Sequence, residues 1–268
     1  MQAEPSLREL TLVVTRPRQQ AARTAVALRE AGAEVIEFPV LVIESIEASL
    51  SSGELVDAAG IIFVSANAVA YGMPVLKRAG EIPAAAQMFA IGRATAAALV
   101  EAGCKNVVSP QQSIDSEGLL ALPQLQHVKG QHIILVKGQS EFGGRALLEQ
   151  TLAARGARVT VLACYRRASF VPDLAAREVL RASLASRRVH GCFVLSVETL
   201  DSLINIFFSM KLSPPPEIVL LVPHARVAEA ARSRGFNKIL QVPLTESAMI
   251  AALAEMKPQL LTHSPLIS

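Results

Sequence analysis

The sequence predicts an α/β protein made of two similar parallel-sheet domains related by an internal repeat and joined by a two-stranded linker. Two observations carry this prediction. Short apolar runs alternate with helical segments along the whole chain, and the second half repeats the pattern of the first. Alternating short strands and helices are typical of a parallel sheet with helices on both faces. The chain has 268 residues, enough for two ordinary domains, and 51% of them are hydrophobic.

Strands are expected where β-forming apolar residues run together. These runs are 10–15, 61–64, 88–91, 107–109, 133–137, 159–165, 192–195, 218–222 and 239–242. Helices are expected between them, several ending at glycine. They are 18–31, 66–79, 94–102, 117–125, 144–155, 174–187, 197–208, 225–234 and 246–256. Segment 35–43 is expected to be extended, and Pro39 inside it indicates an edge strand or a connector.

The internal repeat relates the two halves at constant spacing. Segments 13–41 and 135–165 both read strand, turn, helix, glycine and strand. Each half then has a strand that ends at a serine, Ser65 or Ser196. The separation of these serines equals that of Ile91 and Val222 in the next strands. A separation held constant over such a distance indicates two copies of one α/β domain.

Two extended segments, 35–43 and 159–167, occupy equivalent places in the repeat. Each could stay within its own half or carry the chain into the other. Pro39 and the charges at 166 and 167 favour solvated connectors. If both segments cross, one domain comprises residues 1–37 plus 170–268 and the other comprises residues 44–160. The linkers are then 38–43 and 161–169.

Composition excludes several functional classes. No apolar run approaches the roughly 18 residues that a membrane span needs, and the N-terminus lacks the pattern of a signal peptide. The three scattered cysteines are expected to be buried thiols in a reducing cytoplasm. The net charge is +3 without a lysine-rich block, so neither a nucleic acid nor a membrane is an expected partner. The small positive excess is compatible with an anionic small substrate.

Motifs for cofactors are missing. The sequence has no glycine-rich nucleotide fingerprint, no serine-hydrolase elbow and no Cys/His cluster at metal spacing. His127 and His132 are close in sequence but have no further ligand nearby. The chain is therefore expected to work without a cofactor or metal, as an enzyme or as a binding protein.

Polar or small residues follow several predicted strands. The carboxyl ends of parallel strands form the ligand crevice of doubly wound sheets, and helix N-termini bind anions. The candidate binding residues at these ends are Ser65, Asn67, Thr95, Lys137, Gly138, Ser196 and Arg226. Each serine alone is also explained as a helix N-cap. The glycine-rich segment that runs from Lys137 to Arg145 could wrap carboxylates or phosphates, or be a simple turn.

The chain resembles the uroporphyrinogen-III synthase family from about residue 12 to 256. The resemblance rests on the order and spacing of several short motifs. They are V-T-R-P (14–17), F-V-S-A-N-A-V (63–69), I-G-R-A-T-A (91–96), G-G-R-A-L-L with L-A-A-R-G-A-x-V (143–159), C-Y-R-R (164–167) and V-P-H-A-R-V-A-E-A-A (222–231). It implies two α/β domains with a two-stranded linker, an active site in the cleft between them, a monomer and no cofactor.

The resemblance also implies a reaction and roles for residues. The family cyclises hydroxymethylbilane, a linear tetrapyrrole with eight carboxylates, to uroporphyrinogen III with inversion of the last ring and loss of water. Tyr165 matches the family's candidate for assisting hydroxyl loss, and Thr95, Ser65 and Ser196 match cleft residues. Family members often carry threonine at the position of Arg226, so this arginine is expected to bind a substrate carboxylate instead.

Two other interpretations use the same residues. A non-catalytic, hinged two-domain binding module for an anionic small molecule needs the same fold and helix ends. A nucleotide-using enzyme conflicts with the missing phosphate fingerprints. Tyr165 could also be a phenol that only packs on the linker, with Arg166 and Arg167 in solvent.

Overall fold

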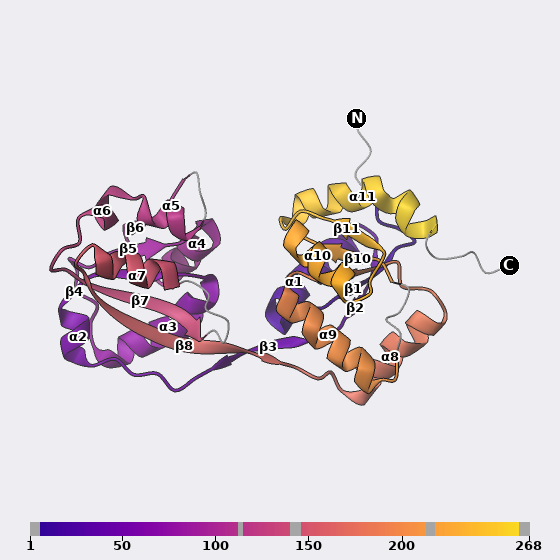
Figure 1. Cartoon of the computed structure of the whole chain (residues 1–268), viewed down its shortest axis with the longest axis horizontal. Coiled ribbons are helices and arrows are strands. Elements are labelled where there is room, and N and C mark those ends of the chain that lie inside the picture. The colour runs from indigo at the N-terminus through magenta and orange to yellow at the C-terminus, as the bar shows by residue number, and fades with distance from the viewer. Residues whose placement is uncertain (1–5, 112–114, 140–145, 213–217, 263–268) are drawn as a thin grey trace. The chain divides into compact units, whose positions relative to one another are not determined.

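The computed structural model describes residues 6–111, 115–139, 146–212 and 218–262 (Figure 1). The chain divides into two compact units. Unit 1 comprises residues 1–42 and 168–268, and unit 2 comprises residues 43–167. The chain therefore begins unit 1, builds the whole of unit 2 and returns to complete unit 1.

Unit 1 is built on a five-stranded parallel sheet in the order β11-β10-β9-β1-β2. The strands are β1 (Thr11–Val14), β2 (Glu34–Glu37), β9 (Gly191–Phe193), β10 (Leu220–Val222) and β11 (Ile239–Gln241). The helices are α1 (Arg18–Glu30), α8 (Leu174–Ala185), α9 (Val197–Ser209), α10 (Ala225–Ser233) and α11 (Glu246–Thr262).

Helices cover both faces of this sheet. Successive strand residues point to opposite sides, so neighbouring residues of one strand pack against different helices. Val13 of β1 packs in a cluster with residues of α8, α9 and α10. Its neighbours Leu12 and Val14 pack in a second cluster with residues of α1 and α11. The continuous apolar runs predicted for these strands follow from this burial on both faces.

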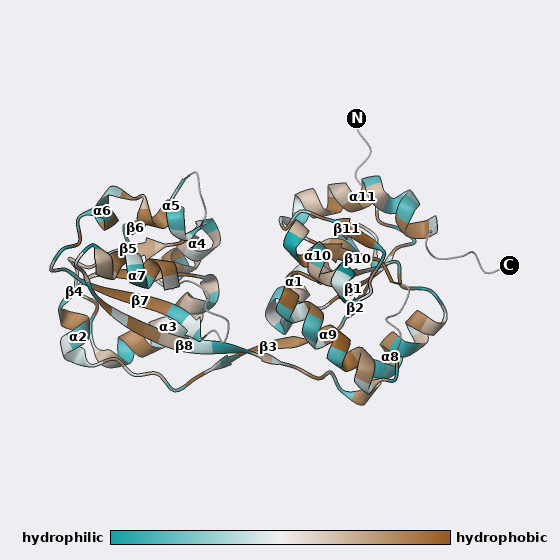
Figure 2. Cartoon of the chain, in the orientation of Figure 1, coloured by the Kyte–Doolittle hydropathy of each residue, from teal (hydrophilic) through white to brown (hydrophobic). Residues whose placement is uncertain are grey.

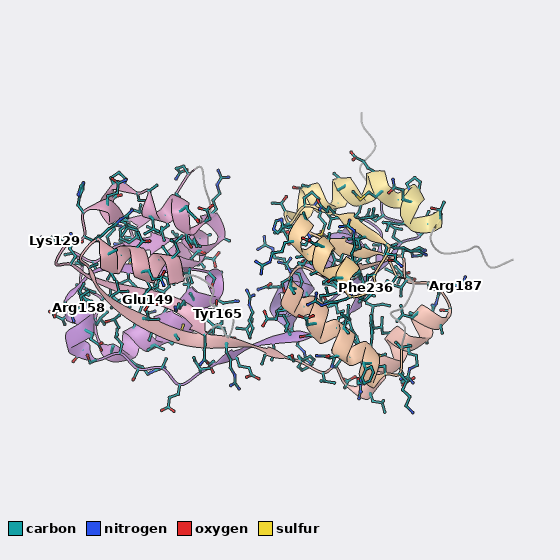
Figure 3. All side chains as sticks on the ribbon, in the orientation of Figure 1. Lys129, Glu149, Arg158, Tyr165, Arg187 and Phe236 are labelled. Carbon is teal, nitrogen blue, oxygen red and sulfur yellow. The ribbon has the colours of Figure 1, made fainter. Side chains whose placement is uncertain are left out.

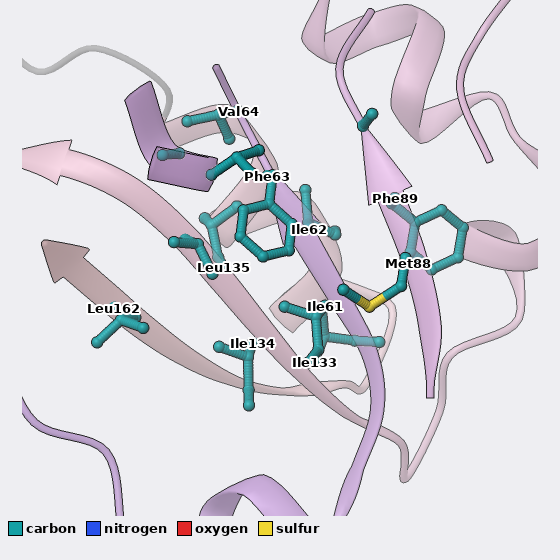
Figure 4. Packing of buried hydrophobic residues seen from close by; sticks show 14 of the residues in the cluster. Ile61, Ile62, Phe63, Val64, Met88, Phe89, Ile133, Ile134, Leu135 and Leu162 are labelled. Carbon is teal, nitrogen blue, oxygen red and sulfur yellow. The ribbon is translucent and has the colours of Figure 1, made fainter. Parts of the chain in front are cut away.

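Unit 2 is built on a six-stranded sheet in the order β3-β8-β7-β4-β5-β6, with β4 to β8 parallel. The strands are β3 (Leu41–Ser45), β4 (Ala58–Phe63), β5 (Gln87–Ala90), β6 (Val107–Val108), β7 (His132–Gln139) and β8 (Arg158–Ser169). The helices are α2 (Ser52–Val56), α3 (Ala66–Ala79), α4 (Arg93–Glu101), α5 (Ser116–Leu120), α6 (Pro123–Gln126) and α7 (Ala146–Ala154). Buried residues of β4, β5, β7 and β8 form the centre of its core (Figure 4).

The two sheets have the same strand order. In unit 1 the order is β2-β1-β9-β10-β11, and in unit 2 it is β8-β7-β4-β5-β6, with β3 added at the edge beyond β8. The strands that the sequence repeat pairs, such as β1 with β7 and β9 with β4, take the same places. The predicted fold class, two similar parallel α/β domains related by a repeat, is confirmed.

Strands β3 and β8 connect the units and pair with each other. The Phe170 N–H donates to the Val40 carbonyl, and the Ile46 N–H donates to the Cys164 carbonyl, so the two strands are antiparallel. Figure 2 shows that β8 is hydrophobic in its first part and hydrophilic towards its pairing with β3. The pair is anchored in both cores, by Leu41 of β3 in unit 1 and by Cys164 of β8 in unit 2.

Several predicted boundaries were wrong. The helix expected over 117–125 is two short helices, because Pro123 opens α6 and cannot continue the preceding helix. The segment 35–43 divides around Pro39 into β2 and β3. Helix α2 was not predicted, although Ser51 and Glu54 form a capping box at its start.

The C-terminal end of β7 also differs from the prediction. It was expected at Lys137, but the strand continues to Gln139. The first residues of the predicted flexible loop, Lys137 and Gly138, are therefore held in the sheet. Residues 140–145, which include Gly143, Gly144 and Arg145, lie outside the described part of the chain.

Candidate functional site

One edge of the unit 2 sheet gathers most of the predicted residues. Strands β8, β7, β4 and β5 are neighbours and run in the same direction, so their carboxyl-terminal ends share this edge. In that order the strands bring Tyr165, Gly138, Ser65 and the start of helix α4 into one row. This is the edge at which ligands bind in open α/β sheets.

Tyr165 lies beside Gly138 on the neighbouring strand. Tyr165 is only 6% exposed, and Figure 3 shows its position on β8. A Cβ atom added to Gly138 would lie 2.6 Å from two ring atoms of Tyr165, Cε2 and Cζ. Gly138 therefore serves as the surface on which the tyrosine ring packs, and its lack of a side chain is a steric requirement of that packing.

A register shift explains the inward position of Tyr165. Lys137 pairs with Ala163 and Gly138 pairs with Tyr165, so Cys164 is an extra residue in β8. Without such a bulge, Cys164 and Tyr165 would point to opposite faces of the sheet. Here both side chains face helix α3: the Cys164 thiol lies 4.0 Å from the Ala68 carbonyl oxygen, and Tyr165 contacts Ser65 and Tyr71. Bulges commonly redirect a side chain in this way next to functional sites.

Ser65 joins the hydroxyl of Tyr165 to the N-terminus of helix α3. The Tyr165 oxygen is 2.9 Å from Ser65 Oγ, and the same Oγ accepts the backbone N–H of Ala68 at 2.9 Å. Ser65 is thus the N-cap of α3 and a hydrogen-bond partner of the tyrosine. If Ser65 Oγ donates to the phenol oxygen, the phenol proton points away and is available to a ligand.

Tyr71 of helix α3 packs against Tyr165 and was not among the predicted residues. The two ring centroids are 5.8 Å apart, with an interplanar angle of 33°. The Tyr71 hydroxyl donates to the Ile43 carbonyl of β3 at 3.1 Å. The signal that could have drawn attention to Tyr71 is its rarity, because the chain has only two tyrosines and no tryptophan.

The remaining predicted residues of unit 2 have different environments. Lys137 forms an ion pair with Glu149 of α7, with 3.4 Å between Nζ and Oε2, so its charge is already partnered. Asn67 is half-buried in the first turn of α3. Thr95 is buried in the first turn of α4, which has Gly92 as its N-cap.

Unit 1 presents the equivalent strand ends. Ser196 caps helix α9, and its Oγ is 2.9 Å from Thr199 Oγ1. Arg226 is exposed in the first turn of α10. No ion pair or hydrogen bond involves its side chain within the described residues.

Arg16 follows β1 in unit 1 and belongs to the V-T-R-P motif. Its Nη1 donates to Thr24 Oγ1 at 2.9 Å, and its Nε is buried without a partner in the described structure. Burial lowers the pKa of this guanidinium, and the nearby carboxylate of Glu246 acts in the opposite direction.

Comparison with known proteins decides the family. Residues 22–251 match the family model HEM4, described as uroporphyrinogen-III synthase HemD. This chain belongs to the uroporphyrinogen-III synthase family. It is 31% identical to uroporphyrinogen-III synthase of Escherichia coli (strain K12) over 244 residues, which cover 86% of this chain and 94% of that protein.

Two solved structures share the fold of this family member. The structure of uroporphyrinogen-III synthetase from Helicobacter pylori 26695 covers 92% of this chain and 99% of its own, with a TM-score of 0.62 and 13% identity. A mutant uroporphyrinogen III synthase from the extremely thermophilic bacterium Thermus thermophilus covers 93% and 99%, with a TM-score of 0.56 and 18% identity.

Arg166 and Arg167 follow Tyr165 on β8. Arg166 forms an ion pair with Glu44 across the linker strands, with 2.9 Å between Nε and Oε2. Its charge thus serves the pairing of β3 with β8.

The described residues contain neither a metal-binding cluster nor a membrane-spanning helix. Within residues 6–111, 115–139, 146–212 and 218–262, no group of three or more His, Cys, Asp or Glu is placed to hold a metal ion. His132 instead lies 2.9 Å from Thr160 Oγ1. None of the described helices has the length and hydrophobicity to cross a membrane.

Proposed function

We propose that this chain is a cyclising lyase of tetrapyrrole biosynthesis that converts hydroxymethylbilane to uroporphyrinogen III, inverting the terminal ring and releasing water. The observation that carries the proposal is the fixed phenol of Tyr165, hydrogen-bonded to Ser65 at the ligand edge of a sheet in a member of the uroporphyrinogen-III synthase family.

Tyr165 is the proposed proton donor. The substrate's hydroxyl leaves as water, so its oxygen must gain a proton as the carbon–oxygen bond breaks. The Tyr165 hydroxyl gives this proton, and Ser65 Oγ donates a hydrogen bond to the phenolate that remains. The Ala68 N–H, at the positive end of helix α3, polarises Ser65 in the same sense.

Ring closure then needs mainly positioning. The azafulvene cation left on the substrate is attacked by the substituted carbon of the terminal pyrrole, which gives a spiro intermediate and leads to inversion. Every bond that forms joins atoms of the same molecule, so holding the chain curled supplies much of the catalysis. The substrate loses a proton at the end of the reaction, and this proton restores the Tyr165 hydroxyl.

Helix N-termini and cations are the proposed ligands for the substrate's carboxylates. Asn67 and Thr95 lie in the first turns of α3 and α4, where unpaired backbone N–H groups favour anions. In unit 1, Ser196 holds the place of Ser65 and Arg226 holds the place of Thr95. Lys137 exchanges Glu149 for a carboxylate at little cost, because such partly exposed ion pairs contribute only about 0–1 kcal/mol.

The isomer of the product tests the function. We expect purified protein supplied with hydroxymethylbilane to yield mostly the type III product, determined by chromatography after oxidation. Without catalysis, ring closure proceeds without inversion and gives type I. A protein that yields only type I contradicts the proposal, and tight substrate binding without turnover would instead support the hinged binding module.

Tyr165→Phe tests the proton donor. It removes the phenol oxygen and keeps the ring on Gly138, so we expect kcat to fall about 10²- to 10⁴-fold, as for loss of a general acid. Thermal unfolding should show that the fold is kept. Unchanged type III formation would remove Tyr165 from the mechanism. We also expect a cytoplasmic monomer, which sedimentation and cell fractionation would test.

A further inference from the structure

We propose that Tyr71 is a positioning residue for this reaction, which fixes the ring of Tyr165 and ties it to linker strand β3. The inference rests on the proposed function, because it assigns Tyr71 a role through Tyr165. It starts from the contact between the only two tyrosines of the chain, whose ring centroids are 5.8 Å apart.

Helix α3 contacts Tyr165 at two points. Its N-cap, Ser65, holds the phenol oxygen, and Tyr71, six positions later, packs against the ring. Tyr165 is thus held at three places: Ser65 contacts its oxygen, Tyr71 packs on one side of its ring, and Gly138 of β7 lies against another. A phenol held at three places does not have to be ordered when the substrate arrives.

Gly72 explains why Tyr71 comes so near. A Cβ atom at Gly72 would collide with Val136 Cγ1 of β7 and lie 3.5 Å from Cys164 Sγ of β8. The helix therefore approaches β7 and β8 as closely as its backbone allows. This close approach sets the neighbouring Tyr71 beside the strand that carries Tyr165.

Tyr71 also reaches the linker. Its hydroxyl donates to the Ile43 carbonyl of β3, at the boundary where unit 2 begins. The side chain that packs on Tyr165 is thus hydrogen-bonded, through its hydroxyl, to a strand that connects the two units. A shift of β3 at Ile43 would be transmitted through one side chain to the proposed proton donor.

The internal repeat supplies an independent observation. Ser202 stands six positions after Ser196, as Tyr71 stands six after Ser65. Ser202 Oγ is 3.2 Å from Ser169 Oγ, at the end of the other linker strand, β8. The same helical position therefore contacts a linker strand in each unit, but only in unit 2 does it carry an aromatic ring.

Two substitutions separate the ring from the hydroxyl. Tyr71→Phe keeps the ring and removes the bond to Ile43, whereas Tyr71→Leu removes both. We expect Tyr71→Leu to lower kcat about tenfold with KM within about twofold, a smaller loss than the roughly hundredfold cost of a 1 Å displacement of a catalytic group. Tyr71→Phe should recover most of this rate.

The same variants give a spectroscopic measurement. Because the chain has two tyrosines and no tryptophan, Tyr165 is the only tyrosine in either variant. Its fluorescence should be quenched more readily by acrylamide in Tyr71→Leu than in Tyr71→Phe. Ser202→Ala, which removes the equivalent linker contact in unit 1, is the matched control and should keep the wild-type kcat.

Three outcomes would overturn the inference. They are a wild-type kcat in Tyr71→Leu, equal quenching of Tyr165 in the two variants, and an equal rate loss in Ser202→Ala, which would indicate only general tethering of the linker. Each leaves the proposed function intact if the wild-type protein still forms the type III isomer. Failure of the wild-type assay would instead remove the proposed function itself.

Discussion

Replacing Gly138 with alanine places a methyl group against the ring of Tyr165. The new Cβ would lie 2.6 Å from Cε2 and Cζ and 3.1 Å from Cδ2. Carbon atoms in ordinary contact are about 3.5–4.0 Å apart, so the ring must move by roughly 1 Å. The backbone at Gly138 does not have a positive φ, so alanine adds no backbone strain and the whole effect is steric.

The displacement has a cost in stability and in rate. Overpacking of a core costs about 1–3 kcal/mol, and the lower chain entropy of alanine in the unfolded state offsets about 0.4–1 kcal/mol. The net loss expected from these two ranges is about 0–2.6 kcal/mol. A movement of about 1 Å breaks the 2.9 Å contact with Ser65, and misplacement on this scale lowers kcat by about 10- to 100-fold.

Denaturant unfolding and the isomer assay measure the two effects. Gly53→Ala is the matched control, because nothing lies within 4 Å of its added Cβ. It should leave kcat unchanged and raise the free energy of unfolding by only the chain-entropy gain of about 0.4–1 kcal/mol. Since Gly138→Ala acts through the phenol oxygen, it should cost little further rate in a Tyr165→Phe background. Additive rate losses in the double variant, or wild-type kcat in Gly138→Ala, would refute the reasoning.

Two further predictions concern titratable groups. Burial raises the pKa of Cys164 to about 11 and of Cys192 to about 12, so neither thiol should react with an aromatic disulfide reagent at about pH 8 until the protein is unfolded. Burial lowers the pKa of His190, whose Nδ1 accepts the Thr11 N–H. The unfolded chain then binds the proton more readily, so the free energy of unfolding should fall as pH drops below about 6.5, and less so in His190→Asn.

The fold could be predicted because its evidence is local and repeated. Each apolar run of strand length indicates one strand, and glycines mark the ends of helices. The constant spacing between the serines indicates which strands of the two halves are equivalent. The predicted boundaries were wrong where one proline, or pairing with a distant strand, decided them. Pro123 divided a predicted helix, and the end of β7 depends on pairing with β8, which no residue near Gln139 reveals.

The site was only partly predictable because it depends on contacts between distant segments. Regular alternation in β8 places Cys164 and Tyr165 on opposite faces, and the register shift that turns both towards helix α3 is set by pairing with β7. Gly138 was expected to bind substrate, yet its visible role is to accommodate the Tyr165 ring. The partner of Lys137, Glu149, was equally invisible because it lies on a separate helix.

The two capping serines offer the sharpest comparison within the chain. Ser65 and Ser196 accept a backbone N–H from the third residue of helices α3 and α9, so each alanine substitution should cost about 1 kcal/mol in stability. Only Ser65 also contacts Tyr165, whereas Ser196 contacts Thr199. Ser65→Ala should therefore lower kcat clearly more than Ser196→Ala at similar thermal stability. Equal kcat in the two variants would mean that Ser65 serves as a cap alone, and the phenol would then need another group to support its charge.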